Sequence, residues 1–261
     1  MRYEILGRQD DKASTVVLSA GLGGLGHFWR PQLEALTAHH RVIVYDQRGT
    51  GANAGALPDD YSIAHMADDV IAVLDDAGVA SCHFVGHALG GLVGLALARC
   101  HPSRLSSLVL VNAWARVDSQ TRRCFEARTA LLKHVGVEAY VRAQPIFLYP
   151  AAWLSEHEDI VRKEEAMGIA HFQGTDNLQK RLRALLAFDA TSDLGEIQTP
   201  AFVAAARDDV LVPFTRSQHL AGNLPNATLW LTHEGGHAFT VTDPMPFNTA
   251  MLAFLAKPTT K

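Results

Sequence analysis

The chain has 261 residues, enough for one large domain with a sizeable core, and its 48% hydrophobic and 19% charged residues are typical of a globular protein. Its net charge of −4 gives no electrostatic support for binding nucleic acid or an anionic membrane surface. A polar N-terminus, the lack of a long apolar run and three cysteines without metal-type spacing favour a cytoplasmic enzyme, with a binding module as the alternative.

Short β-branched runs alternate with amphipathic stretches along most of the chain. This alternation is typical of βα units that build a mostly parallel sheet. Ser62 is a predicted cap of the helix that carries Ile63, Met66 and Val70 on one face. Strands are predicted at 15–21, 41–46, 82–86, 105–113, 199–209 and 226–233, and helices at 31–39, 62–79, 89–102 and 246–256.

The pattern changes between Ala115 and Thr199, where helical periodicity is found at 121–135, 137–144 and 177–189 and no strand is predicted. An all-helical insertion after one strand of a parallel sheet resembles a lid over the carboxyl edge of that sheet. We therefore divide the chain into a core formed by residues 1–115 and 191–261 and a helical lid formed by residues 116–190.

The stretch Gly86-His87-Ala88-Leu89-Gly90 lies where a predicted buried strand passes directly into a helix. It has the G-x-S-x-G spacing of a nucleophile elbow, but Ala88 occupies the serine position. The two glycines permit a sharp turn, and the tip residue of such an elbow takes a left-handed conformation that costs an alanine about 1–2 kcal/mol. The pattern predicts a hydrolase-like turn without its nucleophile, and a close-packed strand–helix turn without function is the alternative.

Residues 21–26 have the sequence GLGGLG, and Asp46 ends the next predicted strand, which is the spacing of a dinucleotide-binding fingerprint. In that motif the helix begins within the glycine turn. Pro31 would then lie inside the helix at a cost of about 3 kcal/mol, whereas it suits the first position of a helix that begins later. We therefore expect no nucleotide cofactor, and a dinucleotide-dependent oxidoreductase is the weaker alternative.

Residues 233–237 match the zinc motif H-E-x-x-H, which requires both histidines on one helical face. Two adjacent glycines disfavour a helix there by about 1 kcal/mol each, and a predicted strand ends at His233. We expect a junction between a strand and a loop, and no metal site.

An acid and a histidine follow the elbow in chain order. Asp209 stands four residues before a proline, just after a buried strand, and His237 follows the last predicted strand; Asp208 is the alternative acid. Elbow, acid and histidine follow one another in this order in α/β-hydrolases. In that fold two backbone amides form an oxyanion hole, and the corresponding amides here are those of Leu22 and Leu89.

Together these features resemble the α/β-hydrolase family over the whole chain. The sequence is more closely similar to the family of aminoacrylate hydrolases of the Rut pyrimidine-utilisation pathway, which also carries alanine at the elbow. The resemblance covers core and lid, and is carried by YDQRGTG (45–51), DYSIAHMADD (60–69), VGHALGGLVG (85–94), TRRCFEAR (121–128), AQPIFLYPA (143–151), AHFQG (170–174) and GGHAFTVTDP (235–244).

This resemblance implies hydrolysis of 3-aminoacrylate to malonate semialdehyde and ammonia. His237 would act as the general base for water, Asp209 would orient it, and the amides of Leu22 and Leu89 would bind the substrate carboxylate. The lid offers Arg122 and Arg123 as further carboxylate partners, and Tyr149, His171, Phe172 and Gln173 as pocket lining.

Two further functional classes stay open, a ligand-binding protein on a hydrolase frame and a cofactor-free lyase or oxygenase that uses the same His–Asp pair. The pair favours turnover, because a receptor would not need it. We expect a small carboxylate as the partner of the protein, neither nucleic acid nor membrane, and we leave a homodimer open.

Overall fold

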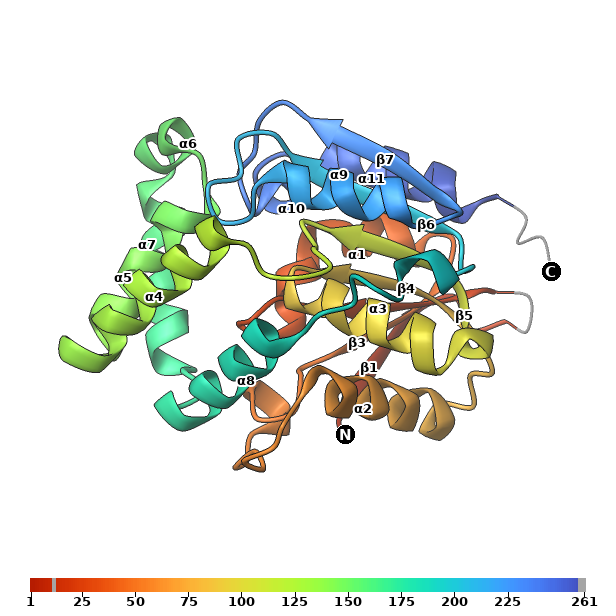
Figure 1. The fold of residues 1–261 in the computed structure, drawn as a ribbon, viewed down its shortest axis with the longest axis horizontal. Helices are drawn as coiled ribbons and strands as arrows, with labels where there is room; N and C mark the ends of the chain where they lie inside the picture. The colour runs from red at the N-terminus through yellow and green to blue at the C-terminus, as the bar shows by residue number, and fades with distance from the viewer. Residues whose placement is uncertain (11–12, 258–261) are drawn as a thin grey trace.

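The computed structural model describes residues 1–10 and 13–257, and these residues form a seven-stranded sheet with helices on both faces (Figure 1). The strands are β1 (Tyr3–Gly7), β2 (Thr15–Ser19), β3 (Arg41–Tyr45), β4 (Cys82–His87), β5 (Leu105–Val111), β6 (Ala201–Ala206) and β7 (Ala227–Thr232). Their order in the sheet is β1-β3-β2-β4-β5-β6-β7. β1 is antiparallel to β3 and the other neighbours are parallel, which confirms the predicted α/β class.

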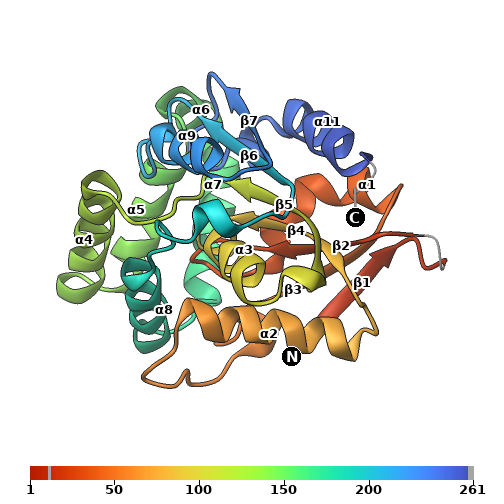
Figure 2. The same cartoon turned by 45° about the vertical axis from the view of Figure 1, so that its right-hand side comes forward.

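Two sets of helices cover the two faces of the sheet (Figure 2). One face carries α2 (Ile63–Asp76), α3 (Leu89–Cys100) and α9 (Phe214–Asn223), and the other carries α1 (Arg30–Thr37), α10 (Phe239–Thr242) and α11 (Pro244–Leu255). The central strands are buried by these layers on both sides, as the near-continuous apolar runs of a parallel sheet require.

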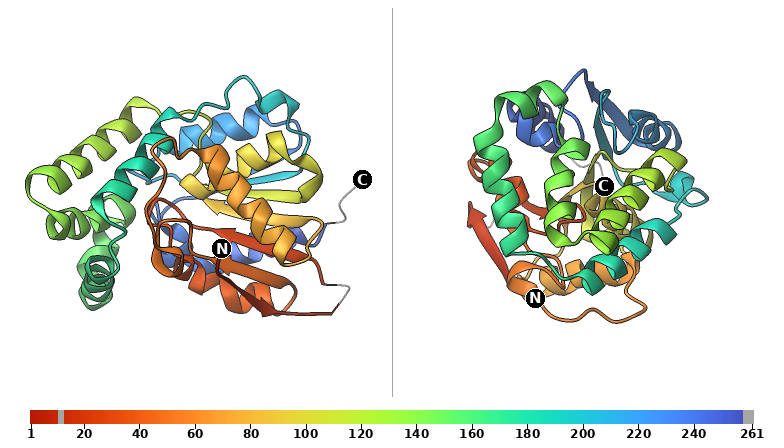
Figure 3. Two further views of the ribbon diagram at one scale, coloured as in Figure 1. Left: turned by 90° about the horizontal axis from the view of Figure 1, so that it is seen from below. Right: turned by 90° about the vertical axis from the view of Figure 1, so that its left-hand side faces the viewer.

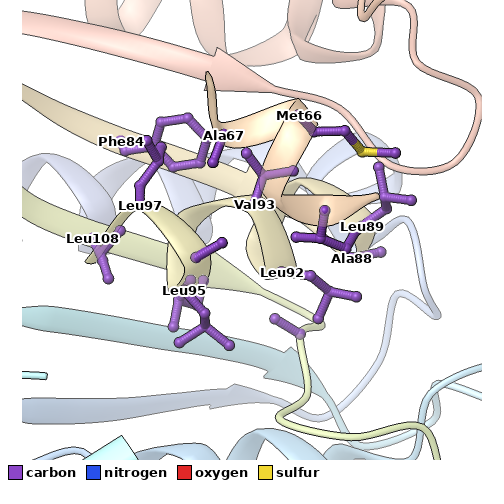
Figure 4. Packing of buried hydrophobic residues seen from close by; sticks show 14 of the residues in the cluster. Met66, Ala67, Phe84, Ala88, Leu89, Leu92, Val93, Leu95, Leu97 and Leu108 are labelled. Carbon is purple, nitrogen blue, oxygen red and sulfur yellow. The ribbon is translucent and has the colours of Figure 1, made fainter. Parts of the chain in front are cut away.

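Helix α3 forms the centre of the larger core cluster. Its residues Leu92 and Val93 pack with Phe84 of β4 and Leu108 of β5 (Figure 4). The helix lies close to the sheet, since a Cβ atom at Gly94 would be 3.0 Å from the Phe84 ring. Burial of each of these side chains stabilises the folded state by about 1.5–3 kcal/mol, and this packing holds α3 against β4 and β5.

The helix boundaries follow the local signals in the sequence. Ser62 caps α2, because its side chain accepts a hydrogen bond from the backbone N–H of His65. Pro31 lies in the first turn of α1, which begins at Arg30, after the glycine turn has ended. Both features were predicted. Because α1 begins only at Arg30, no helix starts within residues 21–26, as a dinucleotide site would require.

Some elements were not predicted. β1 is a half-buried edge strand within a polar segment, so it lacks the apolar run that marks the central strands. Helices α6 (Ala151–Glu156) and α7 (Glu158–Ala170) lie in a stretch with little apolar periodicity, and in α7 only Val161 is buried.

The segment between β5 and β6 is helical and gathers at the carboxyl ends of the parallel strands (Figure 3). It contains α4 (Ser119–His134), α5 (Val137–Leu148), α6, α7 and α8 (Thr175–Ala187). Its two ends meet in an isolated antiparallel bridge between Arg116 and Asp189. We refer to residues 116–190 as the lid, and their role as a cover of the site stays a prediction. In the described part of the chain, no helix is long and apolar enough to cross a membrane.

Candidate active site

The strand-to-helix turn at Ala88 has the backbone of a nucleophile elbow. Ala88 has φ 47° and ψ −110°, in the strained region that L-residues rarely adopt, and α3 begins at the next residue. A Cβ atom at Gly86 would overlap the carbonyl of Gly90, and one at Gly90 would overlap that of Ser19. Glycine is therefore required on both sides of the tip, and a methyl group occupies the position of a nucleophile.

The side chains of His237 and Asp209 form a buried pair. The Nδ1 atom of His237 is 2.7 Å from Oδ2 of Asp209, and the two residues are 3% and 6% exposed. Since a carboxylate only accepts, Nδ1 donates to it, and in the neutral form of this imidazole Nε2 carries the lone pair. Among the described residues, Nε2 has no hydrogen-bond partner, so it is free to accept a proton from water or substrate.

The carboxylate of Asp209 is itself held in place. Its second oxygen, Oδ1, accepts the backbone N–H groups of Leu211 (2.8 Å) and Val212 (2.9 Å). The loop between β6 and α9 thus presents a carboxylate whose orientation is fixed from one side, while its other oxygen orients the imidazole. This arrangement is a base with an orienting acid.

The loop that carries His237 is fixed by residues around it. Asp208 accepts the backbone N–H groups of Gly235 (3.1 Å) and Gly236 (2.9 Å). The carbonyl of His237 accepts Nε2–H of His87 at 2.9 Å and the Nδ2–H of Asn112 at 2.7 Å. Burial holds the pKa of His87 well below its ordinary value, and the neighbouring His237 adds to this, so His87 stays neutral.

His87 and Asn112 were not predicted as supports of the site. The elbow motif could have indicated His87, because this residue directly precedes the tip, and its side chain contacts the loop that carries His237. Asn112 follows β5 with φ 46°, a conformation that asparagine tolerates better than most residues, and no sequence pattern marks it.

The backbone amides of Leu22 and Leu89 are free. Within the described chain, neither N–H has a hydrogen-bond partner, and both follow the carboxyl ends of neighbouring parallel strands, β2 and β4. The carbonyl of Leu22 is occupied by Gln173 Nε2 (3.1 Å) and Arg181 Nη2 (3.3 Å). Two unpaired amides at neighbouring strand ends are available as donors, and their predicted role as an oxyanion hole stays a prediction.

Arg181 of α8 contacts this loop and the loop that follows β3. Its guanidinium is fully buried and donates to the carbonyls of Gly21, Leu22 and Arg48 and to the side chain of Gln47. Burial lowers its pKa to about 10, and it remains a cation at neutral pH. The peptide group between Gly21 and Leu22 therefore has a cation at its carbonyl, which strengthens the dipole of its N–H.

The lid residues predicted from sequence are placed differently from one another. Arg122 and Arg123 are exposed, and Arg123 donates to Ser119 of its own helix, so their role as carboxylate partners stays a prediction. His171 is also exposed. Helical spacing explains the exposure of the two arginines, because residues 122 and 123 lie off the buried face of α4. That face carries Thr121, Cys124, Phe125, Arg128 and Leu132.

The other three predicted lining residues point inward to varying degrees. Phe172 packs with Tyr140 and against the lid cluster that also touches Leu22. Gln173 contacts the Leu22 carbonyl, and its Oε1 atom is buried without a partner in the described chain. Tyr149 is buried, but its hydroxyl donates to Glu164 at 2.7 Å within the lid.

Neither of the two competing motifs has the structure that its chemistry requires. Residues 233–237 form the turn after β7, with His233 exposed and His237 buried, so the two histidines share no helical face. Residues 21–26 form a loop that ends in a short 3₁₀ turn, Gly26–Trp29. In the described ranges, no group of three or more His, Cys, Asp or Glu side chains is arranged to hold a metal ion.

The fold and the site define the class of this protein. Residues 14–134 match the family model described as "alpha/beta hydrolase fold". The structure is similar to a hydrolase from Pseudomonas aeruginosa, with a TM-score of 0.87 and 30% identity, covering 98% of this chain and 94% of the other. It is also similar to an enol-lactonase from Burkholderia xenovorans, with a TM-score of 0.89 and 25% identity, covering 98% and 96%.

Much closer relatives cover almost the entire chain. A protein from Agrobacterium fabrum is 49% identical over 255 residues, which is 98% of each chain. One from Variovorax paradoxus is 54% identical over 258 residues, covering 98% of this chain and 96% of the other. Both are named "Putative carbamate hydrolase RutD". The chain therefore belongs to the RutD family of α/β hydrolases.

Proposed function

We propose that the protein hydrolyses the carbon–nitrogen bond of 3-aminoacrylate, giving malonate semialdehyde and ammonia in pyrimidine catabolism. The observation that carries this proposal is the pair of His237 and Asp209 at 2.7 Å, kept at an elbow whose tip is Ala88. A base oriented by an acid activates water directly, and such general-base catalysis contributes typically 10²–10⁴-fold. The substrate must then react with water without first forming an acyl-enzyme.

3-Aminoacrylate meets that requirement. The enamine takes a proton from solvent at the carbon next to its carboxylate and becomes an iminium ion, whose carbon accepts water. His237 removes a proton from that water as the carbon–oxygen bond forms, giving a carbinolamine. The protonated imidazole then gives its proton to the amine, the carbon–nitrogen bond breaks and ammonia leaves. The hydroxyl proton passes to the now neutral imidazole and on to solvent, which leaves the aldehyde and restores the base. Water is consumed, and no cofactor takes part.

The free amides of Leu22 and Leu89 supply donors for an anionic oxygen, which we assign to the carboxylate of the substrate. This assignment fits the lack of a tetrahedral oxyanion in imine hydration. Ala88 leaves the space at the tip of the elbow to substrate or water. A binding protein on the same frame would have no use for an oriented base, which favours turnover.

Carbamate is the second candidate, because the relatives at 49% and 54% identity carry carbamate hydrolase in their names. Carbamate is also a small amino-substituted anion, and its hydrolysis to bicarbonate and ammonia needs an activated water as well. The two candidates differ in the length of the substrate and in the second product.

The test is ammonia release by the purified protein from each compound, with the rate of the spontaneous reaction subtracted. Aminoacrylate is unstable, so it is released from a stable precursor in the reaction vessel, and malonate semialdehyde is followed by its reduction. The proposal predicts an enzyme-dependent acceleration with aminoacrylate that exceeds that with carbamate. Acceleration with carbamate alone supports the second candidate, and acceleration with neither contradicts both.

A further inference from the structure

Arg128 on α4 is a buried cation with neutral partners. It is 4% exposed, and its Nη2 group donates to the Tyr140 hydroxyl (3.1 Å) and to Oε1 of Gln144 (3.2 Å). The guanidinium carbon lies 5.4 Å from the ring centre of Phe125, 5.3 Å from that of Tyr140 and 5.8 Å from that of Phe147. The side chain is thus enclosed by residues of α4 and α5.

The charge of Arg128 lacks a counter-charge. No carboxylate of the described residues lies within ion-pair distance of it, and its Nε–H group is buried without any hydrogen-bond partner there. Lys180, a buried cation of α8, contrasts with it, because Lys180 pairs with Asp59 (2.9 Å) and Asp176 (2.8 Å). Burying an unpaired charge is costly, and contacts with aromatic rings offset only part of that cost.

The elements that enclose Arg128 also contact the catalytic loops. Four residues before it on α4, Cys124 packs against the backbone of Val210, next to Asp209. At the end of α5, the carbonyl of Leu148 accepts the backbone N–H of Ala238 at 2.9 Å, next to His237. The guanidinium therefore lies between two helices, and each of them contacts one of the loops that carry Asp209 and His237.

The loop that carries Leu22 also packs near Arg128. Tyr140, the partner of Arg128, belongs to the lid cluster that packs against Leu22 and Phe172. Arg128 and Leu22 therefore contact the same cluster of lid side chains.

We propose that Arg128 binds the carboxylate group of a small anionic substrate and supplies the counter-charge that the neutral amides of Leu22 and Leu89 cannot supply. The proposal rests on the proposed function for the location of the reacting carbon, and it assigns the role expected of Arg122 and Arg123 to Arg128. A guanidinium suits this role because its planar donors match a carboxylate. Aminoacrylate and carbamate both present such an anion.

The experiment is an equilibrium titration with acrylate, which has the carboxylate of the substrate but no amine to lose, followed by ligand NMR. Acrylamide, its neutral counterpart, is titrated in parallel. The proteins are the wild type, Arg128→Gln, Arg128→Lys and the control Arg122→Gln, which changes an exposed arginine of the same helix. Thermal unfolding of each variant reports whether the lid packing has survived, and Arg128→Lys keeps the charge if the glutamine variant fails to fold.

Arg128→Gln is expected to weaken acrylate binding at least about tenfold, as the loss of one charge-assisted hydrogen bond implies, while acrylamide binding and the Arg122→Gln protein stay unchanged. Arg128→Lys is expected to retain part of the affinity. Unchanged acrylate binding in Arg128→Gln, equal losses for acrylate and acrylamide, or no acrylate binding by the wild type would each overturn the proposal.

The outcome is separable from the proposed function. Ammonia release from aminoacrylate is measured with the same wild-type preparation. If the wild type turns over aminoacrylate but acrylate affinity is the same in Arg128→Gln, Arg128 does not bind the carboxylate and the proposed reaction still holds. If acrylate affinity falls in Arg128→Gln but the wild type shows no turnover, Arg128 binds the anion and the proposed reaction is wrong.

Discussion

His237 and Asp209 form a 2.7 Å hydrogen bond that the chain holds in place from both sides. Asp208 accepts two amides of the histidine loop, whereas Asp209 contacts the ring itself. The two neighbouring acids therefore have different tasks, one for the backbone and one for the imidazole.

We predict that Asp209→Asn lowers enzyme-dependent ammonia release at least about tenfold, because the amide stabilises the protonated imidazole less well. Asp208→Asn keeps a carbonyl oxygen that accepts one of the two amides, so the rate should fall less and the thermal midpoint should fall slightly. Steady-state rates and unfolding curves of both variants check this. A larger rate loss in Asp208→Asn would reverse the assignment.

The elbow provides a gain-of-function prediction. Ala88→Ser places a hydroxyl at the tip, where we expect it to lie within reach of Nε2 of His237 and of the amides of Leu22 and Leu89 and so to complete a triad. We expect weak esterase activity on a small activated ester and labelling by a small organophosphonate, located by mass spectrometry. Wild type is expected to show neither. A folded variant that labels no better than wild type would show that the register of the site is wrong.

The elbow glycines are predicted to be essential for folding. Gly90→Ala should destabilise the protein by about 3 kcal/mol or more, because its Cβ atom would overlap the carbonyl of Ser19 and lie 2.7 Å from that of Ala20, which are both backbone atoms. Gly222→Ala is the control in α9, where a Cβ atom meets nothing within 4 Å and alanine favours the helix. Equal thermal midpoints of the two variants would contradict the close packing of α3.

Stability should fall in acid because of a buried histidine away from the site. Burial lowers the pKa of His83 to about 4, from 6.5, while its Nδ1 contacts the hydroxyl of Ser107 at 2.7 Å. The unfolded chain therefore binds a proton first as the pH falls, and the free energy of unfolding decreases between about pH 6.5 and 4.

Between pH 7.5 and 5 this single group should contribute a loss of about 2 kcal/mol. Urea unfolding at both pH values is expected to show a loss that is smaller by this amount in His83→Gln than in wild type. His134→Gln, at an exposed position, serves as control and should behave as wild type. The same pH dependence in all three proteins would show that His83 is protonated as easily in the folded state.

The sequence predicts the architecture well because its signals are local. The buried strands are apolar runs, and Ser62 and Pro31 mark helix starts by their own chemistry. His237 and Asp209 are found by their order after the elbow. Their mutual distance depends on the sheet, which brings the ends of β6 and β7 together.

The lid shows where such signals end. Arg122 and Arg123 attract attention as a pair of charges, but the helical stripe of α4 buries Arg128 instead. The periodicity that reveals this stripe was present in the sequence, whereas the packing of α4 against α5, which determines what Arg128 contacts, depends on residues distant in the chain. The same holds for Arg181, whose partners lie 133 to 160 positions away.

The most direct test of the account is the rate of ammonia release from 3-aminoacrylate by wild type and by His237→Ala, each corrected for the reaction without protein. The account predicts that the alanine variant, folded as judged by its thermal midpoint, loses at least about tenfold of the acceleration seen with wild type. Equal acceleration by the two proteins would contradict water activation by the dyad.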